Sequence, residues 1–114
     1  MRDLDLRHRT EGEAVIIEAV GELDIYTVSR LRALVTGVAG TAGVVVLDLD
    51  GVTFIDAAGL AAVVGALRRA RDTGGGLIVV CTREPVLRAL RSAGLLGVLD
   101  IRDTVEAALE AAGG

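Results

Sequence analysis

Asp24, Asp48, Asp50 and Asp56 each follow or interrupt an apolar run, and their carboxylates are the first groups in the chain whose chemistry must be considered. Asp48 and Asp50 alternate with Leu49 in a predicted strand, so their side chains are expected on the same face. A carboxylate pair could bind a cation or act in acid–base catalysis, but the sequence places no third ligand or general acid beside it. We therefore predict neither a metal site nor a catalytic site at this pair.

The remaining reactive residue types do not build an active site either. A single cysteine, Cys81, excludes an internal disulfide and a cysteine-based zinc cluster, and we interpret it as a small core residue. His8 lies in the polar phase of a predicted edge strand and is expected to be solvated. The glycines at 74–76 follow a helix and the chain has no lysine, which excludes a phosphate-binding loop. No nucleophile is paired with a base, so we predict a protein that is not an enzyme and needs no cofactor.

The most informative segment is residues 52–60, Val-Thr-Phe-Ile-Asp-Ala-Ala-Gly-Leu, where an apolar strand runs into an aspartate that opens a helix. Asp56 is predicted to cap that helix by accepting a hydrogen bond from the backbone N–H of Ala58 or Gly59, an interaction worth about 1 kcal/mol. In open α/β sheets, partners and ligands usually bind at the carboxyl ends of the strands. Asp24, Asp56 and Thr82 all fall at such ends.

This junction resembles the signature of the STAS domain family of bacterial anti-sigma factor antagonists, in which the aspartate is followed by Ser, then Ser or Thr, then Gly. Residues 21–24, Gly-Glu-Leu-Asp, are similar to the Gly-x-Leu-Asp pattern of the family. The resemblance implies a protein that binds an anti-sigma factor of the ATP-binding kinase class and so frees a sigma factor. In the family the first serine accepts a phosphate from the kinase. Ala57 has no oxygen to phosphorylate, so the resemblance implies a binding surface without its usual switch.

The expected binding surface joins the start of this helix to the loop that follows the second strand. Ile25 and Tyr26 lie in that loop, where an aliphatic side chain and the only tyrosine would be exposed, and exposed aromatic residues favour interfaces. Packing of the pair into the core is the alternative. The predicted partner-binding residues are Asp24, Ile25, Tyr26, Thr27, Asp56, Ala57, Ala58 and Gly59.

Three nearby hydroxyl groups could in principle replace the missing phosphosite. Thr53 precedes the junction, and Thr27 and Ser29 lie at the start of the first predicted helix. Threonine is common in strands and at helix starts, so we interpret each of the three as structural.

Composition indicates one soluble domain spanning residues 1–114. Apolar residues make up 52% of the chain, with one Tyr, one Phe and no Trp, so the core is expected to be aliphatic. The longest uncharged apolar run, residues 59–67, is much shorter than the roughly 20 residues of a membrane span. Charges within residues 1–5 argue against a signal peptide, and we expect a cytoplasmic protein.

The charge balance argues against direct nucleic-acid binding, because the formal net charge is −4. All 12 basic residues are arginine, and Arg68, Arg69 and Arg71 form a local basic cluster. We interpret this cluster as a solvated helix face.

Hydrophobic periodicity predicts the element order ββαβαβαβα, a single α/β domain whose mixed, largely parallel sheet begins with a β-hairpin. The last helix is expected to begin with a capping box formed by Asp103 and Glu106. The predicted strands are 4–8, 14–20, 44–49, 77–81 and 98–101. The predicted helices are 27–39, 57–73 and 85–93, and a last helix that follows the Asp103 cap and has the apolar stripe Val105, Ala108, Leu109 and Ala112.

Two other functions fit parts of this pattern. The same fold could serve as a scaffold or accessory subunit in a signalling assembly or a lipid transporter. A phosphoaspartate receiver also alternates strands and helices, but receivers need a lysine and begin with a parallel unit rather than a hairpin. The sequence leaves the oligomeric state open.

Overall fold

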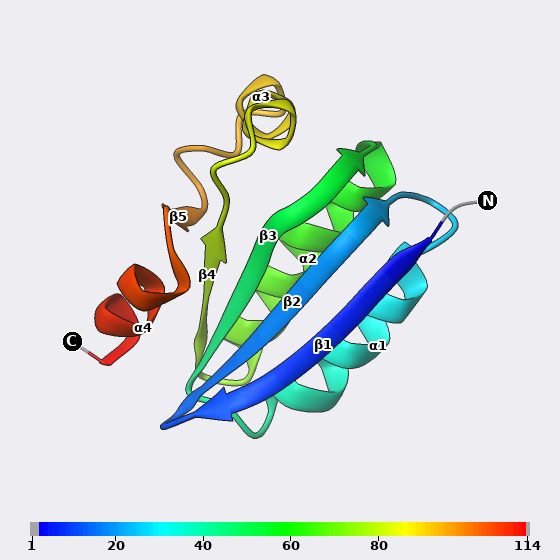
Figure 1. Ribbon diagram of the computed structural model, residues 1–114. Helices are drawn as coiled ribbons and strands as arrows, with labels where there is room; N and C mark the ends of the chain where they lie inside the picture. Colours follow the sequence, from blue (N-terminus) through cyan, green and yellow to red (C-terminus); the bar gives the residue numbers. More distant parts are fainter. Residues whose placement is uncertain (1–2, 114) are drawn as a thin grey trace.

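The sheet begins with an antiparallel hairpin and continues with parallel strands (Figure 1). In the computed structural model, which describes residues 3–113, β1 (Leu4–Glu11) and β2 (Ala14–Leu23) are joined through Gly12, whose φ is +60°. The parallel strands β3 (Val44–Ile55), β4 (Gly76–Val80) and β5 (Asp100–Arg102) follow in the spatial order β1-β2-β3-β4-β5. The predicted mixed, largely parallel sheet is confirmed.

Three helices connect the parallel strands and a fourth closes the chain. They are α1 (Val28–Ala39), α2 (Ala57–Asp72), α3 (Glu84–Ser92) and α4 (Val105–Gly113), so the predicted element order is also confirmed. Because all three crossovers step in the same direction along the sheet, α1 and α2 lie side by side on one face. α4 packs on β3, β4 and β5 from the other face.

The core is aliphatic, as composition predicted, and no aromatic side chain belongs to it among residues 3–113. The larger cluster fills the space between the sheet and helices α1, α2 and α3. A smaller cluster lies under α4, where Ala108 meets Ile16, Val46, Ile78 and Val80. On the face of the sheet that carries α4, no helix within residues 3–113 covers β1 (Figure 1).

β3 is twice as long as predicted because it continues past residue 49 through two irregularities. Its register with β2 shifts between the Glu18 and Val20 pairings, and again between the Gly21 and Glu22 pairings. In each shift β3 contains one residue more than β2, which is the arrangement of a β-bulge. These bulges keep both Leu49 and Val52 buried although they are three residues apart.

Two local predictions were wrong. The capping box at Asp103 and Glu106 does not form; instead Thr104 Oγ1 accepts a hydrogen bond from the Ala107 N–H at 3.0 Å. Thr104 is thus the capping residue, and the helix begins one position later than predicted. The last strand spans only residues 100–102, because the chain through Val98 and Leu99 is held in a turn by the Leu95 carbonyl. The predicted domain boundaries include residues 1, 2 and 114, which lie outside the described residues.

Candidate partner-binding surface

The two segments predicted to form the site lie together at the carboxyl ends of β2 and β3 (Figure 1). β2 ends at Leu23 and β3 ends at Ile55, and these two residues are paired in the sheet. The backbone N–H of Asp56 donates to the Leu23 carbonyl at 3.3 Å, which extends the pairing beyond the strands. The loop of residues 24–27 therefore lies beside the first turn of α2.

The Asp56 carboxylate connects these two segments. Its Oδ1 accepts a hydrogen bond from the Gly59 N–H at 2.9 Å, which confirms the predicted helix cap. Its Oδ2 accepts from the Ile25 N–H at 3.2 Å, a contact across 31 positions that local pattern does not predict. Asp56 thus has a second role, because it fixes the loop to the helix that it caps.

Gly59 is required by the close approach of α2 to the end of β2. A Cβ atom at this position would lie 2.3 Å from the Leu23 carbonyl oxygen and 2.7 Å from Cγ1 of Ile55. Carbon atoms do not approach a backbone oxygen so closely, so only glycine fits without a shift of the helix or strand. The glycine of the Asp-Ala-Ala-Gly sequence is therefore explained by packing.

The glycine of the Gly-Glu-Leu-Asp sequence is also required by the backbone. Gly21 has φ +119°, which L-residues rarely adopt, and a Cβ there would lie 2.4 Å from the Asp3 carbonyl oxygen. The Glu22 N–H donates to the same Asp3 carbonyl at 2.8 Å. This arrangement positions the end of β2 directly before the loop.

The buried side chains of Asp24 and Thr27 hold the loop of residues 24–27 in its conformation through hydrogen bonds to its backbone. They are only 2% and 3% exposed. Asp24 Oδ1 accepts from the Tyr26 N–H at 2.9 Å, and Thr27 Oγ1 accepts from the Asp24 N–H at 3.0 Å while donating to the Glu22 carbonyl at 2.8 Å. These two members of the predicted contact set therefore have almost no surface to offer a partner. Their side chains close the loop.

Ile25 and Tyr26 project from that loop into solvent, with 67% and 76% of their surface exposed. The expectation of an exposed pair is confirmed, and core packing is not the arrangement observed. Ala57 is also exposed in the first turn of α2, and Ala58 is partly buried. Two large apolar side chains and an alanine thus surround a helix N-terminus.

Phe54 extends the apolar surface, and sequence pattern did not identify it. It is 41% exposed, although regular alternation from the buried Val52 would turn it inward. The second bulge of β3 inserts Thr53 between them, so Phe54 pairs with Glu22 on the opposite face. The presence of a single phenylalanine near the junction was the available signal, but the bulge could not be predicted from the sequence.

The three alternative hydroxyl groups differ in accessibility. Thr27 is buried and its hydroxyl is engaged within the loop. Thr53 is exposed, and its Oγ1 donates to the Gly21 carbonyl across the β2–β3 pairing at 3.3 Å. Ser29 is exposed in the first turn of α1. Burial removes Thr27 as a replacement for the missing phosphosite.

The Asp48 and Asp50 carboxylates are used within the fold. Asp48 Oδ1 accepts from the Asp50 N–H at 3.0 Å, and Asp50 Oδ1 accepts from both the N–H and the hydroxyl of Thr82 at 2.6 and 3.1 Å. Burial raises the pKa of Asp48, and the neighbouring Asp50 and Glu18 charges add to this. Asp50 therefore joins β3 to the segment that leads into α3.

Cys81 is buried at 1% exposure, in agreement with its interpretation as a core residue. Desolvation raises the pKa of its thiol. A raised pKa disfavours the reactive thiolate. His8 is exposed on β1, as predicted.

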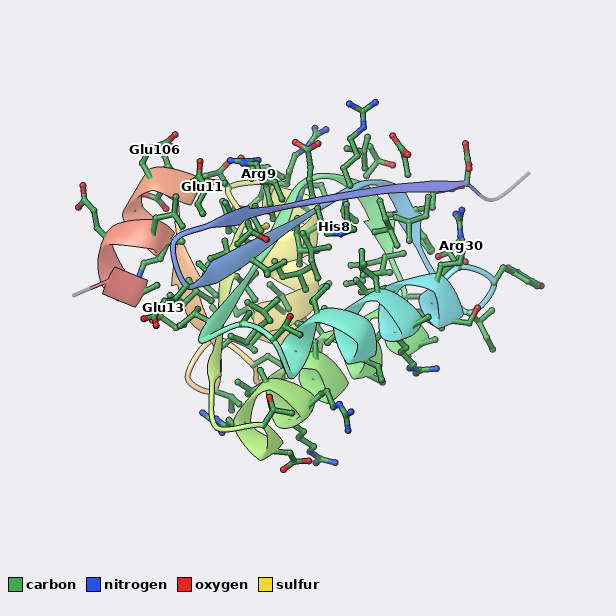
Figure 2. The ribbon with its side chains drawn as sticks, turned by 90° about the horizontal axis from the view of Figure 1, so that it is seen from below. His8, Arg9, Glu11, Glu13, Arg30 and Glu106 are labelled. Atoms are coloured by element: carbon green, nitrogen blue, oxygen red, sulfur yellow. The ribbon has the colours of Figure 1, made fainter. Side chains whose placement is uncertain are left out.

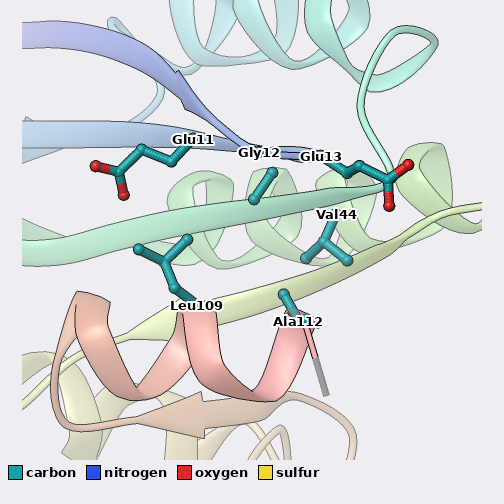
Figure 3. A pocket seen from close by; sticks show the side chains of 9 residues that line it. Glu11, Gly12, Glu13, Val44, Leu109 and Ala112 are labelled. Carbon is teal, nitrogen blue, oxygen red and sulfur yellow. The ribbon is translucent and has the colours of Figure 1, made fainter.

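The remaining surface offers a cavity but no metal-binding cluster within residues 3–113. The cavity, of about 470 Å³, lies between the hairpin turn and the end of α4 (Figure 3). The β3–α2 junction that contains Asp56 is at the opposite end of the sheet (Figure 1). Gly12, Val44, Leu109 and Ala112 line it, with Glu11 and Glu13 at its rim. In the same range of residues, no helix has the length and apolar character needed to span a bilayer.

The two roles of Asp56 can be separated by substitution. Asp56→Ala removes both acceptors and is expected to lower the free energy of unfolding by about 1–2 kcal/mol. Asp56→Asn can keep the Oδ1 cap, because asparagine caps helices as well as aspartate, but its amide nitrogen cannot accept from Ile25. Amide hydrogen exchange is the measurement: Ile25 should exchange faster in both variants, and Gly59 only in Asp56→Ala. Equal protection of Ile25 in wild type and Asp56→Asn would contradict the connecting role.

Comparison with known proteins identifies the family to which this site belongs. A sequence profile of the STAS domain matches residues 5–108, which includes every residue of the loop and of the Asp56 junction. The chain belongs to the STAS domain family. The family resemblance and the fold expected from it are therefore confirmed.

Relatives and solved structures of this STAS domain point to the same group. The chain is 29% identical over 85 residues to the anti-sigma F factor antagonist of Lysinibacillus sphaericus, covering 73% of each protein. It is 26% identical over 106 residues to the anti-sigma-B factor antagonist of Staphylococcus aureus, covering 91% of this chain and 97% of the relative. A crystal structure of an anti-sigma factor antagonist from Mycobacterium paratuberculosis has the same fold, with a TM-score of 0.89, 21% identity and coverage of 98% and 96%.

The same fold occurs inside much larger chains. The murine anion transporter Slc26a9 contains a region that superposes with a TM-score of 0.79 at 17% identity, covering 92% of this chain and 18% of the transporter. At this identity the likeness concerns the fold alone.

Proposed function

We propose that this STAS domain is a non-enzymatic, cytoplasmic anti-sigma factor antagonist that binds an anti-sigma factor of the ATP-binding kinase class and thereby frees a sigma factor. The relatives named above support the general role, because both are antagonists of anti-sigma factors. The observation that carries the proposal is the geometry at Asp56, which holds the exposed Ile25 and Tyr26 beside the first turn of α2. Exposed aliphatic and aromatic side chains on a fixed loop have the character of interface anchors.

The contact surface in this proposal is narrower than the predicted residue set. Ile25, Tyr26 and Ala57 would touch the partner directly, and Phe54 would extend the contact. Asp24, Thr27, Asp56, Ala58 and Gly59 would act by holding the loop and the helix start in place.

In this proposal, regulation at position 57 differs from the phosphorylation switch that the family resemblance implies. A phosphoserine at position 57 would add about −1.5 to −2 charges beside Asp56 and would repel an acidic partner surface. Ala57 cannot carry that group, so the antagonist would remain in its binding state whatever the ATP supply. Control of the complex would then depend on the amounts of the two proteins or on another modified residue.

Restoring the hydroxyl tests this proposal. Wild type, Ala57→Ser and the control Ala61→Ser, which places a hydroxyl one turn further along the exposed face of α2, are each incubated with the anti-sigma factor kinase from the same genome and ATP. Only Ala57→Ser should incorporate phosphate, and its affinity for the kinase should then fall by at least about tenfold, because like charges are brought together at the contact. Phosphate incorporated into wild type would contradict the proposal that this antagonist always remains in its binding state. If Ala57→Ser binds the kinase but is not phosphorylated, position 57 is not the phosphosite that the family resemblance implies.

A scaffold or accessory subunit of a signalling assembly or lipid transporter is the second candidate. Such a role would not need a hydroxyl at the Asp56 junction, where this chain has Ala57 and Ala58. Affinity purification at native expression separates the two. Recovery of transporter or scaffold components without a kinase would favour the second candidate.

A further inference from the structure

The two helices that cover one face of the sheet carry a charge opposite to that of the whole protein. α1 and α2 contain Arg30, Arg32, Arg68, Arg69 and Arg71 but only one acidic residue, Asp72, and all six are exposed. These helices therefore carry +4 in a chain of net charge −4, and the rest of the chain carries −8. Charge of one sign gathered on one face attracts partners of the opposite sign.

Within residues 3–113, the side chains of four of these five arginines form no hydrogen bond or ion pair. Arg30 is the exception, because its Nη2 donates to the Leu4 carbonyl and ties α1 to β1 (Figure 2). Among residues 3–113, no carboxylate forms an ion pair with Arg32, Arg68, Arg69 or Arg71. Their guanidinium groups are thus available to a second molecule.

A groove lies between the two helices in the middle of this basic face. It has a volume of about 250 Å³ and a floor formed by Val35, Ala62 and Ala66, and Thr36 and Gly65 also line it. Arg32 from α1 and Arg69 from α2 stand at its rim. An apolar space of this size can hold an aliphatic side chain, since a cavity of about 150 Å³ already accommodates benzene.

We propose that this groove is a docking site for an acidic amphipathic helix of a partner protein. A helix lying in a groove places apolar side chains at i and i+4 on the floor and its flanking residues at the rim. Glutamates at those flanking positions would pair with Arg32 and Arg69. The groove lies further along α2 than the Asp56 junction. Binding of a helix in this groove does not require that the protein also binds an anti-sigma factor.

An amphipathic helix fits this surface better than nucleic acid does. The side chains of Val35, Ala62 and Ala66 on the floor offer no hydrogen bond to a base or a sugar, and α1 and α2 expose no aromatic side chain on which a base could stack. The net charge of −4 on the whole chain would also oppose a long polyanion, whereas a short acidic helix meets only the basic face.

The test uses a fluorescein-labelled synthetic helix with leucine at i and i+4 and glutamate at the flanking positions. Fluorescence anisotropy should show binding to wild type, and a peptide with lysine in place of each glutamate should not bind. Arg32→Glu with Arg69→Glu should weaken binding by at least about tenfold, because two attractive pairs become repulsive. The matched control, Arg88→Glu with Arg91→Glu on α3, makes the same change in net charge outside the groove and should retain affinity within about twofold.

A second pair of variants tests the groove without changing charge. A Cβ at Gly65 meets nothing within 4 Å, so a side chain there starts in open space. Gly65→Leu is therefore expected to keep the fold, to improve helix propensity and to fill the groove. Gly37→Leu on α1 is equally unobstructed and lies outside the lining residues. Gly65→Leu should abolish peptide binding at unchanged or raised melting temperature, and Gly37→Leu should bind as wild type does.

Three results would overturn the proposal. If both arginine double variants lose the same affinity for the peptide, the peptide is attracted by net charge alone and not by the groove. Unchanged binding by Gly65→Leu would place the peptide elsewhere. Tighter, arginine-dependent binding of single-stranded oligothymidine would assign the surface to nucleic acid.

Discussion

Replacing Gly59 with alanine is expected to lower the free energy of unfolding by about 3 kcal/mol, the upper end of the usual cost of an overpacked core position. The added methyl group would lie 2.3 Å from the Leu23 carbonyl oxygen. That oxygen cannot move aside easily, because it accepts the hydrogen bond of Asp56 N–H that joins the ends of β2 and β3. Relief requires α2 to move away from the sheet, which also separates Asp56 from the Ile25 N–H.

Equilibrium urea denaturation measures this effect, and the chain contains its own matched control. Gly65 lies on the same helix, and a Cβ there has open space around it. Gly65→Ala should therefore raise the free energy of unfolding by about 0.5–1 kcal/mol, the ordinary gain of alanine over glycine within a helix. Gly59→Ala with wild-type stability would show that α2 does not approach β2 as closely as the structure has it.

Removing the two exposed anchors is expected to have the largest effect on function. Ile25→Ala combined with Tyr26→Ala should weaken binding to the anti-sigma factor by about 30-fold or more, which corresponds to about 2 kcal/mol and is typical of truncated interface hot spots. Unfolding should be almost unchanged, because the two side chains are 67% and 76% exposed and contribute little to the core.

Titration calorimetry with the purified anti-sigma factor gives the affinity. Leu96→Ala with Val98→Ala is the control, because these side chains are 39% and 49% exposed in the turn before β5, far along the sheet order from the β2 loop. It should bind within about twofold of wild type, since exposed apolar side chains outside a contact rarely affect affinity. If both double variants lose the same affinity, the partner does not bind at the Asp56 surface.

Most of the helices and strands could be predicted because each has a hydrophobic pattern of its own in the sequence. The stripe of Leu31 and Val35 marked α1, and the aliphatic run of residues 44–49 marked a buried strand. Asp56 before a helical stripe predicted a cap that the structure confirms. These patterns depend only on residues that are close together in the sequence, so they can be recognised without knowledge of the tertiary structure.

Predictions failed where two local signals competed or where another strand set the geometry. Asp103 and Glu106 have capping-box spacing, but Thr104 offers a hydroxyl one residue later and caps α4 instead. Phe54 has the phase of a buried residue, yet a bulge that exists only in the register with β2 turns it outward. Neither outcome can be decided from the sequence of a single element.

By itself, the sequence determined the family, the element order and the absence of a hydroxyl at position 57, because each follows from residue types at fixed spacing. Tertiary structure alone decided which residues of the loop are exposed and which are buried. Asp24 and Thr27 turn inward and Ile25 and Tyr26 turn outward because the loop closes its own hydrogen bonds and because Asp56, 31 residues away, accepts the Ile25 N–H. That contact requires β2 and β3 to be paired, and strand pairing is a property of the folded sheet rather than of either segment.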